Sequence, residues 1–416
     1  MLGMKKICLS DSSQVNSRLL LWEKVLFLFL FFFQFFLYFS GGRETESQIP
    51  QWVSLPVESA FLVYITYLCF TRRFRFSGMV YYILALTIMA TLIGYSNKGS
   101  VSINLLTSYM ILVGCIMTLI SEEKIFKYIF LLSIIGIIIV LKEFIFYDAS
   151  QAAVVLVDRV LIHDIPLFKS ISLLWMFTLL IIISFVFKKY FLLAGIVWTL
   201  NMIVNLMATK RLFVVQTAWI LVILLLFFYI TKQSKQMKVL LIIIPVVLLL
   251  GVVAFSFFDL DYHVFIEALE ERSSADNVED TGFIRFRESA NYFKTASFSD
   301  IIMGKGFGVI HHGLGENNTD LHIGFTNLIL KHGIWMLFLF IPLVLKSFLS
   351  IFKMRNYYYS DPWRVVCILV TLVNVPMFCT VANFYTLSPN TALFWYCLIR
   401  STYTPNNPFI IKSRCF

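Results

Sequence analysis

The segment from 257 to 333 holds most of the side chains in this chain that could do chemistry. It carries half of the 24 acidic residues and five of the six histidines, whereas the rest of the chain is mostly apolar. His322 stands where this polar segment gives way to the apolar run that begins at Ile323. An imidazole at such an edge is partly shielded from water and can act as a general base near neutral pH. A histidine that only caps the start of a helix would occupy the same position, so both interpretations stay open.

Two arginines, Arg285 and Arg287, lie close together in the stretch GFIRFRES. A guanidinium binds phosphate oxygens in pairs, so either arginine could hold a pyrophosphate group. On a helix they would face different directions, and their spacing does not decide between them. The alternative is structural, because either arginine could instead pair with a nearby acid such as Glu288 or Asp280.

A second basic pair, Lys210 and Arg211, lies between two apolar runs with no other polar loop around it. Charges at the edge of a membrane are costly and usually functional, and an anionic ligand is the simplest compensation. The alternative is that both long side chains reach out to lipid headgroups.

His311, His312 and Asp320 precede His322 and are further candidates for binding substrate. Adjacent histidines point apart in any regular structure, and neither HxxxH nor HExxH spacing is present, so we expect no metal site. The stretch GKGFG at 304–308 lacks the GxxxxGK[ST] pattern of a phosphate-binding loop. Its glycines are expected to permit a tight turn or a close backbone approach. No cofactor is predicted.

Composition indicates a polytopic membrane protein. The 416 residues are 59% hydrophobic and only 14% charged, and the mean hydropathy is +0.82. Soluble domains carry about 25% charged residues. The net charge of +10 arises from short basic clusters between apolar runs, which is the pattern of orientation signals rather than of nucleic-acid binding. The seven cysteines form no CxxC pair and avoid the polar segment, so neither a disulfide framework nor a zinc site is expected.

We therefore expect an all-α fold of about twelve membrane-spanning helices with one large, partly helical loop on the outer side. Residues 1–256 would form spans one to nine, 257–323 the outer loop, and 324–416 the last three spans and a tail. Lysine and arginine are concentrated in one of the two alternating sets of loops, and this bias predicts that both termini lie in the cytoplasm. The outer loop is expected to hold an amphipathic helix at 262–272, an acidic linker at 273–280, a helix at 285–296 and a loose glycine-rich stretch. The predicted spans are 21–40, 52–70, 77–95, 102–120, 126–146, 170–187, 190–208, 212–231, 238–257, 324–346, 364–383 and 389–400.

The run DLHIGFTNLILKHGIWMLFLF resembles the signature of the superfamily of O-antigen polymerases and O-antigen ligases. Members have a histidine followed eleven residues later by a glycine, and His322 and Gly333 keep that spacing. The block TGFIRFRESANYFKTASFSDIIMGKGFG is similar to the family's arginine, helix and glycine-rich turn. ATKRLFVVQ at 208–216 is similar to its upstream arginine. The chain departs from the pattern at Ile323, where Asn is common, and at Lys331, where Glu is common.

This resemblance implies a glycosyltransferase of the GT-C-like kind in a bacterial inner membrane, with its outer loop in the periplasm. The donor would be a glycan on undecaprenyl pyrophosphate. Arg211 and either Arg285 or Arg287 would hold the pyrophosphate, and His322 would take the proton from the acceptor hydroxyl. The reaction would invert the sugar carbon and need neither metal nor nucleotide. Membrane lipid and a chain-length regulator are the other expected partners, and nucleic acid is not one.

Three functions fit these features. A polymerase would use another carrier-linked repeat unit as acceptor, whereas a ligase would transfer finished polymer to lipid A-core. A transporter of lipid-linked oligosaccharides would also have about twelve spans, but it would usually show repeated halves and broken helices, which the sequence does not reveal. We expect a surface-polysaccharide polymerase.

Overall fold

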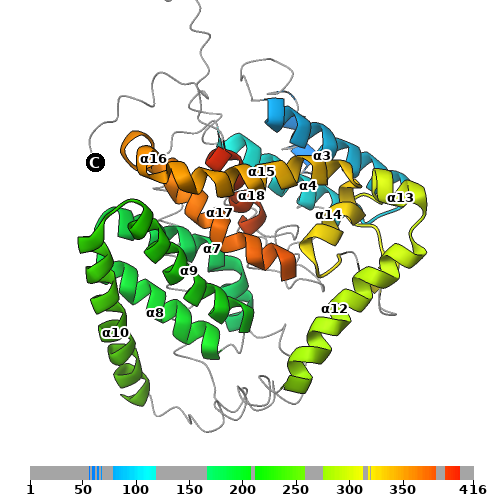
Figure 1. Cartoon of the computed structure of the whole chain (residues 1–416). Helices are drawn as coiled ribbons and strands as arrows, with labels where there is room; N and C mark the ends of the chain where they lie inside the picture. The colour runs from blue at the N-terminus through cyan, green and yellow to red at the C-terminus, as the bar shows by residue number, and fades with distance from the viewer. Residues whose placement is uncertain are drawn as a thin grey trace, which may run out of the picture.

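In a computed structural model of the chain, the described residues are 78–118, 166–207, 211–257, 275–312, 317–318, 320–380 and 389–402, with a few single residues between 56 and 67. This part of the chain is helical apart from one antiparallel pair of two-residue strands (Figure 1). Its elements are α3 (Gly78–Ser96), α4 (Val101–Met117), α7 (Pro166–Phe187), α8 (Phe191–Met207), α9 (Arg211–Ile230), α10 (Ser234–Phe257), α12 (Ala275–Thr295), α13 (Phe298–Met303), β1 (His311–His312), β2 (Asn317–Asn318), α14 (Gly324–His332), α15 (Trp335–Leu349), the 3-10 turn η2 (Ser350–Lys353), α16 (Met354–Ser360), α17 (Pro362–Thr380) and α18 (Pro389–Thr402).

Most predicted spans within the described residues correspond to one helix each, because long apolar runs satisfy their backbone groups only within a helix. The helices α3, α4, α7, α8, α9, α10, α17 and α18 begin and end within about four residues of the predicted bounds. By length and hydropathy, Gly78–Ser96 and the continuous stretch Trp335–Ser360 are each sufficient to cross a membrane. Shorter apolar helical stretches of the described residues are Thr178–Phe187, Phe191–Met202, Val214–Ile230 and Pro362–Pro376. The spans predicted at 21–40, 52–70 and 126–146 lie wholly or mostly outside the described residues.

The prediction of one continuous span at 324–346 is wrong. The helix breaks after α14 at Gly333, whose φ of +68° no helix contains, and α15 starts afresh at Trp335. The amide of Gly333 donates to the carbonyl of Ile329 (2.9 Å), and the next amide, Ile334, donates to the carbonyl of Ile301 (3.0 Å). The break is therefore stabilised by a contact with α13, and α14 and α15 run in different directions (Figure 1).

The segment predicted to form an outer loop also differs from its prediction. Residues 275–280, predicted as part of an acidic linker, form the first turns of α12, which continues to Thr295. The acids that suggested a linker lie at the start of this helix, where the helix dipole favours negative charge. The amphipathic helix predicted at 262–272 lies outside the described residues.

Helix α18 lies at the centre of the bundle and contacts α4, α7, α15 and α17. Its side chains from Ala392 to Ile399 are almost completely buried. Phe394 stacks on Phe378 of α17 (ring centroids 5.8 Å apart), and Phe378 stacks on Phe340 of α15 (4.6 Å). The shortest predicted span is thus deeply buried, since it packs on α4, α7, α15 and α17.

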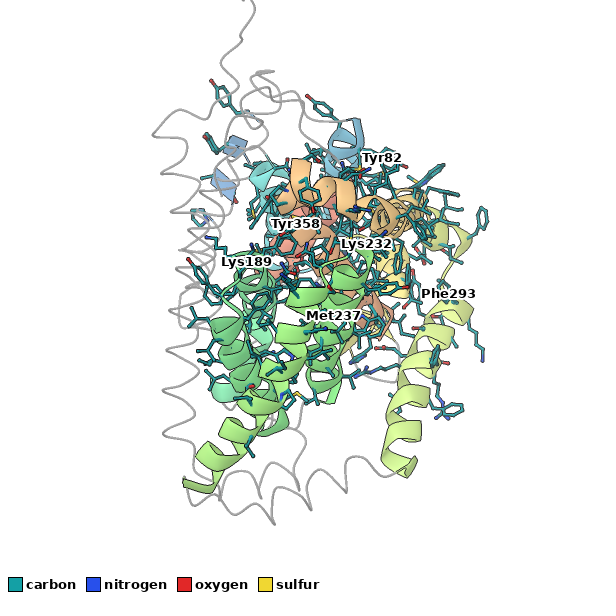
Figure 2. All side chains as sticks on the ribbon, turned by 60° about the vertical axis from the view of Figure 1, so that its left-hand side comes forward. Tyr82, Lys189, Lys232, Met237, Phe293 and Tyr358 are labelled. Carbon is teal, nitrogen blue, oxygen red and sulfur yellow. The ribbon has the colours of Figure 1, made fainter. Side chains whose placement is uncertain are left out.

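One end of the bundle, here called the basic end, gathers the lysine-bearing turns that follow α7 and α9. The ring of Tyr358 in α16 contacts Phe187 (5.7 Å) and Phe227 (5.8 Å), which stand just before Lys189 and Lys232 (Figure 2). The bias of lysine and arginine predicts that the turns after α7 and α9 face the cytoplasm.

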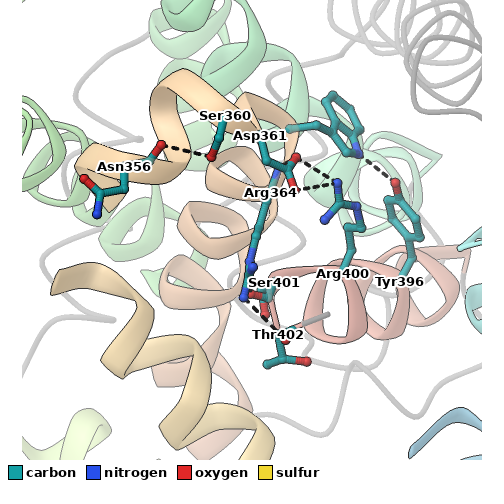
Figure 3. Close-up of polar contacts among 9 residues, drawn as sticks. Asn356, Ser360, Asp361, Arg364, Tyr396, Arg400, Ser401 and Thr402 are labelled. Atoms are coloured by element: carbon teal, nitrogen blue, oxygen red, sulfur yellow. Dashed lines mark hydrogen bonds and ion pairs between the residues drawn. The ribbon is translucent and has the colours of Figure 1, made fainter. Parts of the chain in front are cut away.

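A polar network closes α17 against α18 at this basic end (Figure 3). Arg400 donates through Nη2 to both carboxylate oxygens of Asp361, at 2.8 and 2.9 Å. Arg364 donates through Nε to the carbonyl of Ser401 (3.0 Å). Because the network joins the start of α17 to the end of α18, these two helices run antiparallel and the other end of α17 lies at the opposite end of the bundle.

Candidate functional site

A histidine–carboxylate pair, His322 with Glu288, lies at the end of the bundle opposite the basic end. His322 Nδ1 is 2.8 Å from Glu288 Oε2, and the backbone amide of His322 donates to the same oxygen at 3.0 Å. The side chain of Glu288 is only 1% exposed, whereas that of His322 is 50% exposed. An ionised carboxylate only accepts hydrogen bonds, so Nδ1 carries the proton and Nε2 is the ring atom able to accept one. This arrangement suits a general base, because Glu288 fixes the ring through Nδ1 and leaves Nε2 to accept a proton.

The pKa of Glu288 is shifted in the direction that this pairing requires. Burial alone would raise the pKa of the Glu288 carboxyl. The hydrogen bonds from the side chain and backbone of His322, together with the positive charge on His322 and on His311 when these are protonated, outweigh burial and lower the pKa below 4.5. Glu288 is therefore ionised at neutral pH and accepts both hydrogen bonds from His322.

One face of α12 positions Glu288 against the start of α14. Glu288, Ser289 and Tyr292 are all buried, and with Arg285 they follow the spacing of a single helix face. Ser289 Oγ is 3.1 Å from Thr326 Oγ1, one turn into α14. We call this the inner face of α12. It places the Glu288 carboxylate next to His322, which lies 34 residues later in the sequence.

The two candidate arginines, Arg285 and Arg287, lie on different faces of α12. Arg285 lies one turn before Glu288 on the inner face of α12 and is half-buried. Arg287 is exposed and points to the opposite side of the helix, because successive residues turn about 100°. Of the two, only Arg285 shares a face with the histidine–carboxylate pair.

Asp320 has a partner within the protein. Its Oδ1 is 2.8 Å from Nζ of Lys331, whose side chain is almost completely buried. Asn327 Nδ2 donates to the same Asp320 oxygen (3.2 Å), and Asn327 Oδ1 accepts from the amide of Leu321 (3.1 Å). These bonds tie the turn before His322 to α14. In the structure Asp320 pairs with Lys331 and Asn327, and its predicted role in binding substrate stays a prediction.

His311, in β1, lies beneath the pair and is only 2% exposed. Its ring is 6.3 Å from that of Tyr292, centroid to centroid. Burial lowers the pKa of His311, although the backbone of Asp320 and the carboxylate of Glu288 oppose that effect. Neither ring nitrogen forms a hydrogen bond of good geometry with any described residue. The backbone of His312 pairs with Asn317, and its side chain lies outside the described part of the structure.

The glycine-rich stretch at 304–308 is tight rather than loose, which corrects the prediction. A Cβ on Gly306 would lie 2.1 Å from the backbone nitrogen of Gly94 in α3, and φ at Gly306 is +85°. The amide of Lys305 donates to the carbonyl of Leu330 (2.7 Å). The stretch thus joins α3 to the end of α14, and the predicted close backbone approach is confirmed.

The start of α9, where Arg211 lies, and the start of α14 meet the same part of α17. Gln216 Nε2 of α9 is 3.5 Å from Asn374 Oδ1 of α17. One turn further along α17, Phe378 packs edge-on against Phe325 of α14 (ring centroids 5.2 Å apart). The end of α17 thus contacts both. The side chain of Arg211 and all of Lys210 lie outside the described residues.

No family model, no curated protein and no solved structure matches this chain. Among the described residues, no group of three or more histidine, cysteine or acidic side chains is arranged to hold a metal ion. The candidate site residue that sequence reasoning missed is Glu288, which was considered only as an ion-pair partner for the arginines. Its position one turn after Arg285 was the available signal.

Proposed function

We propose that this chain is a membrane glycosyltransferase that joins glycan repeat units carried on undecaprenyl pyrophosphate. The observation that carries the proposal is the pair of His322 and Glu288, a half-exposed imidazole held by a buried carboxylate. Such a pair supplies a base of fixed orientation and needs no metal to activate a hydroxyl. The resemblance of the 322–333 stretch to O-antigen polymerases and ligases supports the same chemistry.

The reaction follows from the roles of three groups. His322 Nε2 takes the proton of the acceptor hydroxyl, whose oxygen attacks the anomeric carbon of the donor. The bond from that carbon to the pyrophosphate oxygen breaks, and its electron pair leaves with undecaprenyl pyrophosphate. Arg285 on the inner face of α12 and Arg211 at the start of α9 would stabilise this negative charge. Attack from the side opposite the leaving group inverts the sugar carbon.

Location in a membrane is supported by the apolar surface of the bundle. Large apolar side chains are exposed along one side of α9 at helical spacing, over most of its length. Soluble monomers rarely expose apolar surface of this extent. We propose about twelve spans in the inner membrane, with the histidine–carboxylate pair at the periplasmic side. The exposed side chains of α9 are Val215, Trp219, Val222, Leu226 and Tyr229.

Complementation of a polymerase-null strain tests the proposal. The wild-type chain should restore a ladder of polymer lengths. His322→Ala should reduce ladder synthesis by about 10²- to 10⁴-fold, the usual contribution of a general base. Glu288→Gln should reduce it by roughly tenfold, on the scale of one charge-assisted hydrogen bond. Lys98→Ala, an exposed residue in the turn after α3, is the control and should leave the ladder intact.

A normal ladder from His322→Ala, at equal protein level, would contradict the proposed role of His322. Attachment of preformed polymer to lipid A-core without new polymer would identify a ligase instead.

A further inference from the structure

Helix α12 has a second face that points away from the protein and is rich in phenylalanine. Phe283, Phe286 and Phe293 are 60%, 70% and 38% exposed. They lie on the side of the helix opposite Glu288 and Tyr292, so the buried face is the polar one and the exposed face is the aromatic one. Arg287 and Lys294, both exposed, share that side. We call these five residues the outer face of α12.

The described structure leaves most of Phe283 and Phe286 exposed and covers part of Phe293. Helix α12 stands at the flank of the bundle (Figure 1) and contacts it through its inner face. Phe298, which is 81% exposed at the start of α13, adds apolar surface beside the end of α12. A row of rings of this kind in water would be unfavourable by about 25 cal/mol for each Å² of apolar area left exposed. Some apolar phase is therefore expected to cover it.

The charges on the outer face indicate which phase that is. Arg287 and Lys294 stand among the rings, and the described residues include no ion-pair partner for either. Aromatic rings with interspersed Lys and Arg are typical of helices that lie in the headgroup region of a bilayer, with rings toward the acyl chains and cations at lipid phosphates. We infer that the outer face of α12 rests on the outer surface of the membrane.

A second copy of this chain fits the outer face less well. A symmetric contact would bring Arg287 and Lys294 close to their own equivalents. The five residues of the outer face include two cations and no acid, whereas Asp276, Glu279 and Asp280 lie nearer the start of α12. A symmetric contact centred on the five residues would therefore bring like charges together. Lipid phosphate, by contrast, is complementary to both cations.

This docking surface gives the two arginines of α12 separate partners. Arg287 binds bilayer phosphate, whereas Arg285 remains on the inner face for the proposed chemistry. Contact with lipid on one side of α12 would hold Glu288 and His322 at the level where a lipid-linked substrate presents its pyrophosphate. The inference rests on the proposed insertion of the chain in a membrane, and it does not require glycosyl transfer.

Site-specific photo-crosslinking of the full chain in vesicles tests the inference. The benzophenone amino acid p-benzoylphenylalanine replaces Phe283, Phe286 or Phe293 in turn, and the products are resolved by mass spectrometry. The vesicles contain phosphatidylglycerol with phosphatidylethanolamine. Thr295, exposed on the same helix but on the opposite side from Phe286, is the matched control position. Each phenylalanine position should give at least fivefold more lipid adduct than position 295. Adding Arg287→Glu should lower the adduct at 286 at least twofold, while Arg287→Lys should not.

Three results would overturn the inference. One is a similar lipid yield at position 295 and at the phenylalanine positions. Another is a main product that links two copies of the chain. The third is the absence of lipid adducts in a chain that remains in the membrane after alkaline washing. Each leaves the ladder assay unaffected, so failure here and failure of the proposed glycosyl transfer are distinguishable.

Discussion

The carboxylate of Glu288 accepts two hydrogen bonds from one residue, the ring and the backbone amide of His322. Two bonds to one oxygen restrict both the position and the rotation of the imidazole. Burial of Glu288 makes the pair depend on ionisation, because a buried protonated carboxyl would lose the strong acceptor. In this site the buried carboxylate of Glu288 orients the half-exposed imidazole of His322, and the imidazole is the group that can meet a substrate.

The lowered pKa of Glu288 predicts how stability depends on pH. A carboxyl whose pKa falls below 4.5 on folding contributes stability above that value, and the contribution is lost as the pH drops through the folded pKa. The melting temperature of the wild type should therefore exceed that of Glu288→Gln at neutral pH. The difference should shrink below pH 4.5. Differential scanning fluorimetry in detergent measures it, and a difference that is constant or grows in acid would contradict the pairing.

At the scale of elements, backbone contacts that admit no side chain assemble the site. The stretch at 304–308 packs against α3, and the break between α14 and α15 packs against α13. These contacts fix where α14 begins and thereby where His322 stands relative to α12. The sequence predicted one continuous span because hydropathy averaged over many residues is hardly changed by a single glycine such as Gly333.

A substitution at Gly333 should disrupt this arrangement. A Cβ there would lie 2.1 Å from the carbonyl oxygen of Ile302, and φ is +68°. Gly333→Ala should destabilise the protein by about 3 kcal/mol or more, from strain and overlap together. Gly78→Ala is the control, since nothing lies within 4 Å of its added Cβ. Thermal unfolding of both variants measures the effect, and equal melting temperatures would disprove the close approach.

At the scale of the whole molecule, the two ends of the bundle differ in chemistry. The basic end carries Lys189, Lys232 and the paired Arg400 and Asp361. The opposite end carries His322 and Glu288. Lysine and arginine favour the cytoplasmic side, so this polarity predicts an orientation in the membrane.

Cysteine labelling in intact cells tests that orientation. Lys98→Cys, in the exposed turn after α3, should react with a membrane-impermeant maleimide. Lys189→Cys and Lys232→Cys should react only after the membrane is permeabilised. The unsubstituted chain sets the background from its own cysteines, of which Cys115, Cys367 and Cys397 are buried. The reverse pattern would place the histidine–carboxylate pair in the cytoplasm and exclude the proposed periplasmic reaction.

The sequence by itself predicted α3, α4, α7, α8, α9, α10, α17 and α18 and singled out His322 as a candidate site residue. Long apolar runs form helices because their backbone groups find partners only within the run, and that is a local property. The tertiary structure decided what His322 pairs with, which arginine shares its face, and that Asp320 belongs to Lys331. It also decided that the span after His322 breaks at Gly333. These features depend on how α12, α13 and α14 pack, and such contacts between distant residues leave no periodic signal in a single chain.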